Sequence, residues 1–284
     1  MENKNDIWTE IITPRRGWLD INLKEIWRYR DLILLFVRRD FVSVYKQTIL
    51  GPLWLFIQPI FTTFIFYFVF NRIAKISTEG IDPILFYLSG ITLWNYFSDC
   101  FLKTSNTFTS NASIFGKVYF PRLTTPISIV ISNLIKFIIQ LILFGCVVFY
   151  QVYFNDVKIQ PNLYLLLLPY LVFLMAIMGL GMGILFSALT TKYRDLSFLL
   201  AFGIQLLMYA TPIIYPLNFT QGKLHTILSY NPISPILENF RFSFFGSGNF
   251  DFSGLIYASI FSFLTLIIGI IFFNRVENKF MDTV

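Results

Sequence analysis

Runs of apolar residues, each long enough to cross a bilayer, recur along the chain and limit its fold more than any other feature. A helix rises about 1.5 Å per residue, so roughly 20 apolar residues span the hydrocarbon core of a membrane. These runs lie at 53–71, 84–102, 126–150, 163–189, 196–215 and 254–274. The sequence therefore predicts an all-α integral membrane protein with six transmembrane helices.

Composition excludes a soluble globular domain. Of the 284 residues, 56% are hydrophobic and 13% are charged, whereas a soluble domain carries about one quarter charged residues. The net charge of +6 does not indicate nucleic-acid binding, because the basic residues crowd into the first 50 positions beside Trp and Leu. That pattern is typical of anchoring at a membrane surface.

The distribution of lysine and arginine predicts the orientation of the chain. The tails and the second and fourth loops hold sixteen of these residues, and the opposite loops hold five. By the positive-inside rule, both termini lie in the cytoplasm. We divide the chain into a cytoplasmic segment at 1–52, a six-helix domain at 53–274 and a cytoplasmic tail at 275–284.

The segment before the first span combines apolar and basic residues. Apolar side chains recur at roughly helical spacing from Leu23 to Tyr45. This pattern predicts an amphipathic helix in the cytoplasmic headgroup layer, with Trp18 and Trp27 at the interface. A soluble helix packed against a partner is the alternative.

A stretch at 216–253, between the fifth and sixth spans, is too long for a simple connection. It is rich in aromatic residues, and the runs at 223–229 and 235–244 fit short helices. We expect an external cap or re-entrant hairpin, because backbone at membrane depth must be buried against protein or a water-filled cavity. A disordered loop is the weaker alternative, since it would expose a large apolar patch.

Polar side chains within apolar spans are costly unless they face protein or a cavity. Five such residues occur: Gln58, Asn133, Lys136, Gln140 and Gln205. Hydrogen bonding between helices and the lining of a cavity remain equal alternatives, and Lys136 could also snorkel to the surface. Small residues at 179, 183 and 187 predict close helix packing rather than a nucleotide-binding loop.

Catalytic and nucleotide-binding signatures are missing from the sequence. The Walker A pattern is absent, since Gly116 and Lys117 precede a valine, and the single histidine, His225, has no partner for catalysis. We predict that the chain is not an enzyme, that it holds no metal, and that ATP-driven work needs another polypeptide.

Aromatic side chains are abundant near the span ends, where interfacial belts and packing account for most of them. Aromatic faces also stack on sugar rings, so some could line a channel for a glycan. The channel-lining candidates are Phe66, Tyr67, Trp94, Tyr96, Tyr209 and Tyr215.

The loop after the second span, SNASIFGKVYFPRLTTP at 110–126, joins an apolar aromatic surface to Lys117 and Arg122. It fits a docking element for a partner protein. An amphipathic connection at the headgroup level fits equally well.

Three segments resemble the type 2 ABC-transporter permeases that export polysaccharides such as O-antigen, capsule and teichoic acid. They are RRDFVSVYKQTILGPLWLFIQP at 38–59, FGKVYFPRLTTP at 115–126 and KYRDLSF at 192–198. The resemblance implies a homodimer in the cytoplasmic (inner) membrane of a bacterium, beneath which two copies of a separate ABC ATPase bind ATP and Mg. It also implies a channel for a lipid-linked glycan, with this chain binding no cofactor itself.

The resemblance also implies roles by position. The segment from Trp18 through Trp27 to Arg30 resembles the interface helix of the family, and 216–244 resembles its external re-entrant helices. The residues that the resemblance assigns to coupling with the ATPase are Ile114, Phe115, Lys117, Tyr119, Phe120, Arg122, Tyr193, Arg194 and Asp195. Basic residues that could attract the pyrophosphate of the lipid carrier, or simply anchor the topology, are Arg28, Arg38 and Arg39.

Two other functions remain open from the sequence. A type 2 ABC exporter of a small lipid or drug would need a narrower path without sugar-stacking aromatics. An integral-membrane glycosyl or acyl transferase would need an acid, base or metal site, yet Asp40, Asp99 and Asp195 are scattered along the sequence.

Overall fold

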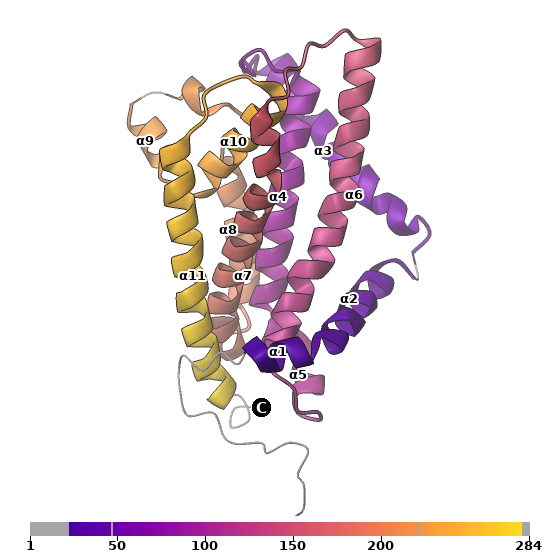
Figure 1. Ribbon diagram of the computed structural model, residues 1–284, viewed down its shortest axis with the longest axis vertical. Coiled ribbons are helices and arrows are strands. Elements are labelled where there is room, and N and C mark those ends of the chain that lie inside the picture. Colours follow the sequence, from indigo (N-terminus) through magenta and orange to yellow (C-terminus); the bar gives the residue numbers. More distant parts are fainter. Residues whose placement is uncertain (1–22, 47, 221, 280–284) are drawn as a thin grey trace, which may run out of the picture.

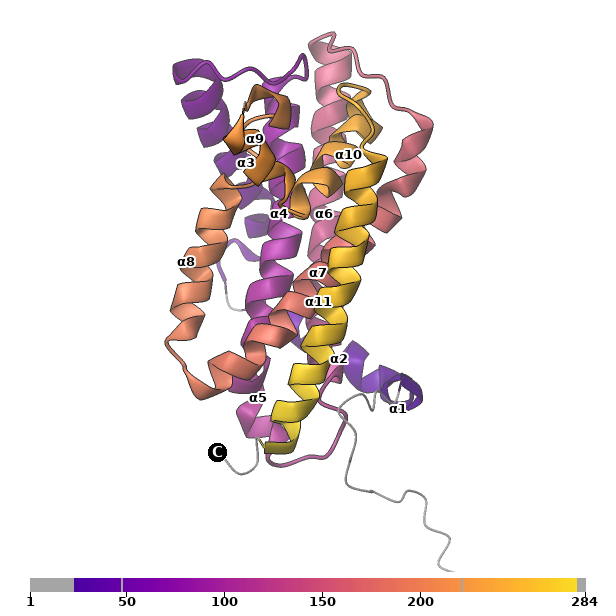
Figure 2. The same ribbon diagram turned by 90° about the vertical axis from the view of Figure 1, so that its left-hand side faces the viewer.

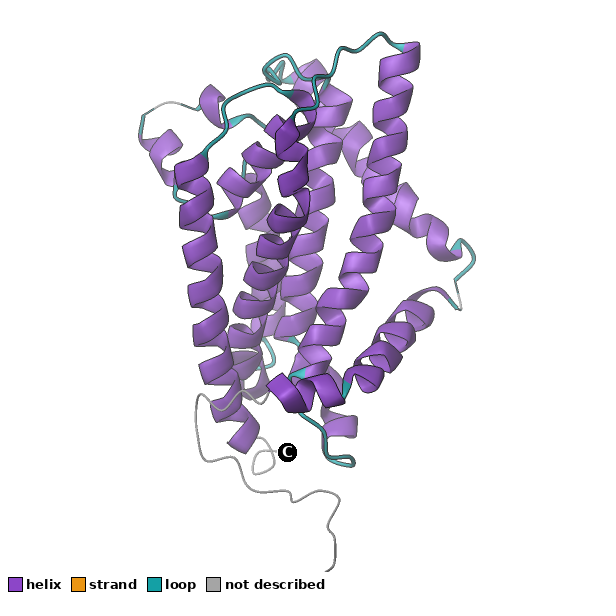
Figure 3. Cartoon of the chain, in the orientation of Figure 1, coloured by secondary structure: helices purple, strands orange, loops and turns teal. Residues whose placement is uncertain are grey.

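The long helices of the chain form a bundle with roughly parallel axes (Figure 1). A computed structural model describes residues 23–46, 48–220 and 222–279, and all its regular elements are helical (Figure 3). The described chain begins and finishes at one end of the bundle, beside α5, while α9 and α10 lie at the opposite end (Figure 1). We refer to these as the α5 end and the α10 end.

The helices have the following bounds. In the first half they are α1 (Leu23–Arg28), α2 (Arg30–Tyr45), α3 (Trp54–Phe66), α4 (Pro83–Ser105), α5 (Thr107–Phe115) and α6 (Thr124–Phe154). In the second half they are α7 (Leu168–Lys192), α8 (Leu196–Tyr209), α9 (Lys223–Ser229), α10 (Ile233–Phe245) and α11 (Phe252–Lys279). Short 3-10 or π-helical turns are η1 (Gly51–Leu53), η2 (Tyr67–Ile73), η3 (Leu163–Leu167) and η4 (Leu217–Phe219).

Within the described part of the chain, four helical segments are long and apolar enough to cross a membrane, which confirms an all-helical membrane protein. They are Gly51–Ile73, Thr124–Phe154, Leu163–Lys192 and Phe252–Arg275. The helix at Leu196–Tyr209 is apolar but shorter. Each of the six predicted runs contains a helix, although α4, at 23 residues, is not among these four apolar segments.

Helix α4 is the central element of the bundle. Its start is well defined, because Asp82 Oδ1 accepts hydrogen bonds from the backbone N–H groups of Ile84 and Leu85 and Pro83 occupies the first turn, as at many helix N-termini. Helices α3, α6, α7 and α8 all contact it, and most of its side chains are buried. A helix surrounded by protein can carry polar residues that a lipid-facing helix cannot.

The glycines of α7 allow close packing on two of its sides. A Cβ at Gly179 or Gly183 would lie 2.8 Å from Cys100 Cβ or 2.6 Å from Thr104 Cβ of α4, and one at Gly181 would lie 2.6 Å from the backbone nitrogen of Leu266 of α11. These distances are too short for any side chain larger than hydrogen. The prediction of close helix packing at these small residues is confirmed.

The prediction that the fifth run is helical to position 215 is wrong at its end. Helix α8 ends at Tyr209, and residues 210–215 form turns and bends. Pro212 lacks a backbone N–H, and its ring disfavours the helical conformation of the preceding residue. The chain therefore turns back at this point toward α10.

The region between α8 and α11 contains the predicted short helices. Helix α9 has the predicted bounds, and α10 begins two residues earlier than expected, at Ile233. Helix α10 is largely buried and contacts α4, α7 and α11, so it lies inside the α10 end of the bundle (Figure 2).

The segment before the first predicted span is helical from Leu23, in two pieces that meet at Tyr29. Ile33, Phe36 and Val37 are buried, while Leu34 and Leu35 on the opposite side are about 60% exposed. Two apolar faces on one helix suit contact with protein on one side and with lipid on the other. Trp18 lies outside the described residues.

Candidate functional site

An aromatic cluster at the α5 end joins four parts of the chain. We define the α5 cluster as Phe36 of α2, Phe108 and Phe115 of α5, Phe120 of the following turn and Phe273 of α11. The ring centroids lie 5.7 Å apart for Phe36 and Phe120, 5.6 Å for Phe115 and Phe120, and 4.7 Å for Phe108 and Phe273. All five rings are buried. The turn at 116–123 therefore packs, through Phe120, into one cluster with α2, α5 and α11.

The predicted coupling residues divide into a buried and an exposed set. Phe115 and Phe120 belong to the α5 cluster, and Ile114 packs against it. The Arg122 guanidinium lies 5.7 Å from the centroid of the Phe115 ring. The exposed tip consists of Lys117, Val118 and Tyr119.

The second predicted contact, Tyr193 to Asp195, is exposed in the short connection between α7 and α8. The Lys192 ammonium lies 5.0 Å from the centroid of the Tyr193 ring. Arg194 and the first half of α5 line the same cavity of about 430 Å³. The structure thus brings Arg194 beside α5, but at the opposite end of α5 from Lys117.

The basic residues before the first span have different surroundings. Arg28, Arg38 and Arg39 are exposed, and Trp27 is 69% exposed. Arg39 also stacks over Phe36 at 4.7 Å and donates a hydrogen bond of 3.4 Å from Nη2 to Asn111 Oδ1 of α5. Arg39 therefore connects α2 to α5, which the sequence pattern did not reveal.

The channel-lining candidates also differ in exposure. Phe66, Trp94 and Tyr96 are buried in the subunit, whereas Tyr209 is 48% exposed. The Tyr67 hydroxyl accepts a 2.6 Å hydrogen bond from Arg72, and the Tyr215 hydroxyl donates one of 2.8 Å to the Tyr209 carbonyl.

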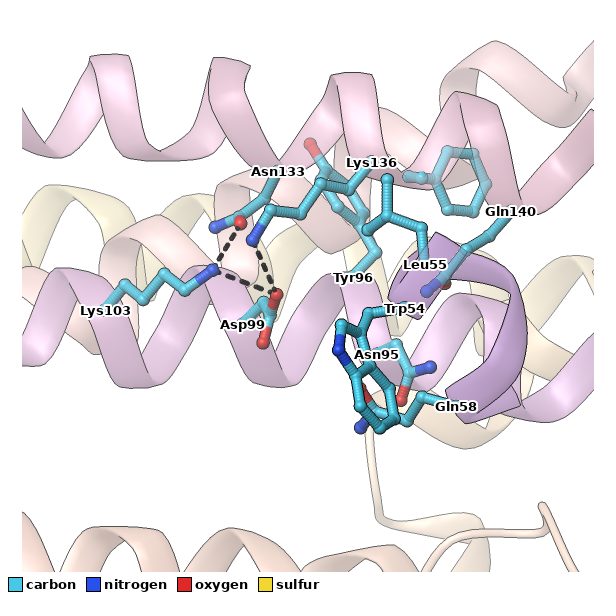
Figure 4. Close-up of a pocket in the computed structure, with 11 residues that line it drawn as sticks. Trp54, Leu55, Gln58, Asn95, Tyr96, Asp99, Lys103, Asn133, Lys136 and Gln140 are labelled. Carbon is cyan, nitrogen blue, oxygen red and sulfur yellow. Dashed lines mark hydrogen bonds and ion pairs between the residues drawn. The ribbon is translucent and has the colours of Figure 1, made fainter. Parts of the chain in front are cut away.

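A polar cavity of about 280 Å³ lies among α3, α4 and α6 (Figure 4). We call it the lysine pocket. Its polar side chains are Gln58, Asn95, Tyr96, Asp99, Lys103, Asn133, Lys136 and Gln140, and its other side chains are Trp54, Leu55 and Phe137. Four of the five polar residues predicted to face protein or a cavity are among them. The fifth, Gln205, is exposed on α8.

Two lysines share one carboxylate in the lysine pocket. Asp99 Oδ2 lies 3.1 Å from Lys103 Nζ and 3.6 Å from Lys136 Nζ. Lys103 also donates a 2.9 Å hydrogen bond to Asn133 Oδ1. Sequence reasoning did not include Asp99 and Lys103 in this site, although their four-residue spacing on one helix indicates that they can pair.

Arg241 of α10 forms a second cationic centre, which is buried and which we call the arginine clamp. The residue is 1% exposed, and its guanidinium donates to the carbonyls of Pro212 at 2.6 Å, Ile213 at 3.1 Å and Phe86 at 3.3 Å. Glu238 lies 3.5 Å away, and the guanidinium stacks over the Phe86 ring at 3.6 Å. The arginine clamp ties the chain after α8 to both α4 and α10.

Among the residues that the structure describes, no group of three or more His, Cys, Asp or Glu comes together to hold a metal ion.

Comparison with known proteins gives matches over most of the chain. Residues 31–245 match the family described as ABC-2 type transporter. An O-antigen export system permease protein RfbA of Klebsiella pneumoniae is 28% identical over 254 residues, which cover 89% of this chain and 94% of that protein. A second Klebsiella pneumoniae protein of the same name is 27% identical over the same shares. The Myxococcus xanthus protein of that name is 24% identical over 225 residues, covering 78% of this chain and 84% of that relative.

The family match extends from α2 to α10, so it includes the lysine pocket, the arginine clamp and most of the α5 cluster. Permeases of this family are membrane subunits that lack an ATPase domain and pair with an ABC ATPase. The resemblance noted in the sequence is thereby confirmed, and the chain belongs to the ABC-2 type transporter family as a membrane permease subunit.

Proposed function

We propose that the chain is the permease subunit of an exporter that moves a polyprenyl-diphosphate-linked, O-antigen-like polysaccharide from the inner leaflet across the cytoplasmic membrane. The observation that carries this proposal is the match to O-antigen export permeases over 89% of the chain and 94% of the relative. The match therefore extends over nearly the whole length of both proteins.

The proposed topology has six membrane crossings with both termini in the cytoplasm. Helices α4 and α8 complete the set with the four long apolar segments. The sixteen basic residues predicted for the cytoplasmic side against five for the other support this orientation. The α5 end is then cytoplasmic, and α9 and α10 form the external re-entrant region.

The proposed docking surface for two ABC ATPase subunits lies at the α5 end of a homodimer. It consists of the exposed tip from Lys117 to Tyr119 and the connection from Tyr193 to Asp195, with the remaining coupling residues supporting the tip from within. Closure of the ATPases on ATP would push the tip, and the α5 cluster would pass this motion to α2 and α11.

The proposed glycan path runs between α3 and α8 of two subunits. Helix α8 stands apart from α6 and α11 (Figure 2) and exposes Phe198, Phe202 and Tyr209. Helix α3 exposes Phe61 and Phe64. Tyr209 and Tyr215 remain lining candidates, whereas burial of Phe66, Trp94 and Tyr96 favours packing or, for Tyr96, the wall of the lysine pocket.

The test of the docking proposal is co-purification of the tagged chain with its cognate ABC ATPase in mild detergent. Lys117→Glu combined with Val118→Asp should abolish the complex, because both side chains are exposed and neither supports the α5 cluster. Lys158→Glu, exposed on the connection after α6, is the matched control and should leave the complex intact. Retention of the complex by the double variant would contradict the docking surface.

The test of the substrate uses the complex with its ATPase in nanodiscs. Polyprenyl-diphosphate glycan should stimulate ATP hydrolysis, whereas a small lipid or a drug should not. Stimulation only by the small lipid or drug would favour the alternative exporter. Transfer of sugar or acyl groups by the chain without its ATPase would favour the enzyme alternative.

A further inference from the structure

The lysine pocket carries an excess of positive charge. Within the described residues, Asp99 is the one carboxylate within ion-pair distance of Lys103 and Lys136. The three side chains therefore carry a net charge of +1 when all are ionised. In surroundings of low dielectric constant an unbalanced ammonium group is costly, and an anionic ligand would relieve that cost.

The two ammonium groups retain hydrogen-bonding capacity. Each ammonium group has three donors. The acceptors that they contact within the described residues are Asp99 and Asn133 for Lys103, and Asp99 for Lys136. The lysine side chains are 42% and 15% exposed for Lys103 and Lys136, respectively. The pair is thus partly desolvated yet remains accessible from the cavity.

The lysine pocket can hold a group of substantial size. Its volume of about 280 Å³ far exceeds the roughly 30 Å³ share of one water molecule. Amide side chains of Gln58, Asn95 and Gln140, from α3, α4 and α6, line the same pocket beyond the lysines (Figure 4). Lysine ammonium and amide N–H groups are donors suited to phosphoryl oxygens.

The lysine pocket lies in the half of the bundle nearer the α5 end. Lys136 is twelve residues beyond the start of α6 at Thr124, which is about 18 Å along the helix, and Lys103 lies in the last turn of α4. A second cavity of about 200 Å³ shares Lys103, Asn133 and Lys136 and is also lined by Asp40 and Ser43 of α2. Polar side chains therefore lead from α2 to the lysines.

We propose that the lysine pocket binds the phosphoryl headgroup of a lipid, with Lys103 and Lys136 contacting its oxygens and the lipid chain leaving past Trp54. Trp54 is 49% exposed at the start of α3, where an apolar chain could pass into the bilayer. Identification of that lipid as a polyprenyl diphosphate rests on the proposed function; the phosphoryl chemistry rests on the lysine pocket alone.

A purely structural ion-pair network is the competing explanation. The direction in which two substitutions change the headgroup affinity separates it from a binding site. Lys136→Gln removes a ligand contact, so headgroup binding should weaken about tenfold. Asp99→Asn removes the competing anion, so binding should strengthen by about threefold. A structural network predicts no such opposition, because both substitutions would disrupt the same network.

The experiment measures binding of polyprenyl diphosphate to the purified full chain in detergent by native mass spectrometry. Phosphatidylglycerol, phosphatidylcholine and inorganic pyrophosphate are compared as competitors. Lys136→Arg keeps the charge and N–H donors for phosphoryl oxygens, so it should bind more tightly than Lys136→Gln. Lys158→Gln on the exposed connection after α6 is the matched lysine control and should not change binding.

Each outcome decides the proposal. Displacement by inorganic pyrophosphate, together with opposite effects of Lys136→Gln and Asp99→Asn, supports a phosphoryl site. Equal binding of phosphatidylglycerol supports the site with a bilayer phospholipid as its source, and preference for the polyprenyl lipid supports the carrier. Unchanged binding in a folded Lys136→Gln variant, or loss of binding in Lys136→Arg when that variant remains folded, overturns it. Failure of ATPase co-purification would instead affect the proposed function, since the binding assay needs no ATPase.

Discussion

Two cationic centres in the same bundle, one buried and one partly exposed, are built in opposite ways. At the α10 end, the guanidinium of Arg241 meets three backbone carbonyls, a carboxylate and an aromatic face, and the residue is 1% exposed. In the lysine pocket, Lys103 and Lys136 share Asp99 beside a cavity of about 280 Å³. The arginine clamp has its donors occupied, whereas the lysine pocket retains donors and space for another group.

This difference distinguishes a charged side chain that stabilises the fold from one that is available to bind a ligand. A buried ion that is fully hydrogen-bonded holds its neighbours in place, and removal of it leaves several polar groups unpaired. A charge with donors to spare beside a cavity contributes less to the fold because its partners are incomplete. Substitutions in the two centres should therefore rank in a definite order.

The largest effect is expected for Arg241→Met. The substitution leaves Glu238 and the carbonyls of Phe86, Pro212 and Ile213 without their donor, so the free energy of unfolding should fall by about 3–5 kcal/mol. The measurement is reversible unfolding in mixed micelles. Arg72→Met on an exposed arginine is the control, with an expected loss below about 1 kcal/mol. Equal losses would show that the arginine clamp has no special role.

A smaller loss is expected for Gly90→Ala, which acts on the arginine clamp from α4. A Cβ at Gly90 would lie 2.9 Å from Arg241 Nη2 and 3.1 Å from Ile213 Cγ2, so the clamp must shift at a cost of about 1–3 kcal/mol. Gly145→Ala in α6 is the matched control, because nothing lies within 4 Å of its Cβ position. The same micelle assay should show no loss for Gly145→Ala, and a comparable loss there would refute the clash.

A loss of about 1 kcal/mol is expected for Asp99→Asn, since two ammonium groups lose a carboxylate that is itself 44% exposed. The comparison becomes sharper when a lipid with a phosphoryl headgroup is added. If the lysine pocket binds this lipid, adding it should raise the thermal stability of Asp99→Asn more than it raises that of the unmodified chain. A headgroup that stabilises both proteins equally would argue against direct competition between Asp99 and the ligand.

The smallest effect is expected for Lys136→Met. Lys103 and Asp99 remain paired, and a methionine of similar length replaces an incompletely paired charge, so stability should change by less than about 0.5 kcal/mol. Lys103→Met provides the comparison within the lysine pocket, because it removes both the 3.1 Å ion pair and the 2.9 Å hydrogen bond to Asn133. A loss for Lys136→Met as large as that for Arg241→Met would abolish the distinction between the two centres.

Much of the helical plan could be predicted from the sequence, because apolar runs and small residues report lipid exposure and close approach directly. Lys136 drew attention because a charge inside an apolar run needs a partner. The partners themselves were harder to find, since Lys103 lay just beyond the predicted span and Asp99 was grouped with distant carboxylates. A search for four-residue charge spacing on the second span would have identified that pair.

The arginine clamp could not have been predicted in the same way. Three of the Arg241 partners are backbone carbonyls, and a carbonyl has no signature in the sequence. The sequence also could not predict which aromatic side chains are buried and which are exposed. Trp94 is buried because α4 is surrounded by other helices, and a single sequence does not specify which helices are neighbours.

The bare glycine surfaces of α7 have a mechanical consequence. Close contact with α4 on one side and α11 on the other makes these three helices a rigid unit, because no side chain at the glycines can rotate to let them shift. Helix α8 contacts α4 and α7 less extensively, and the short connection 193–195 joins one end of α8 to this rigid unit. Displacement of residues 193–195 should therefore tilt α8 as a rigid body, with its other end held by the arginine clamp.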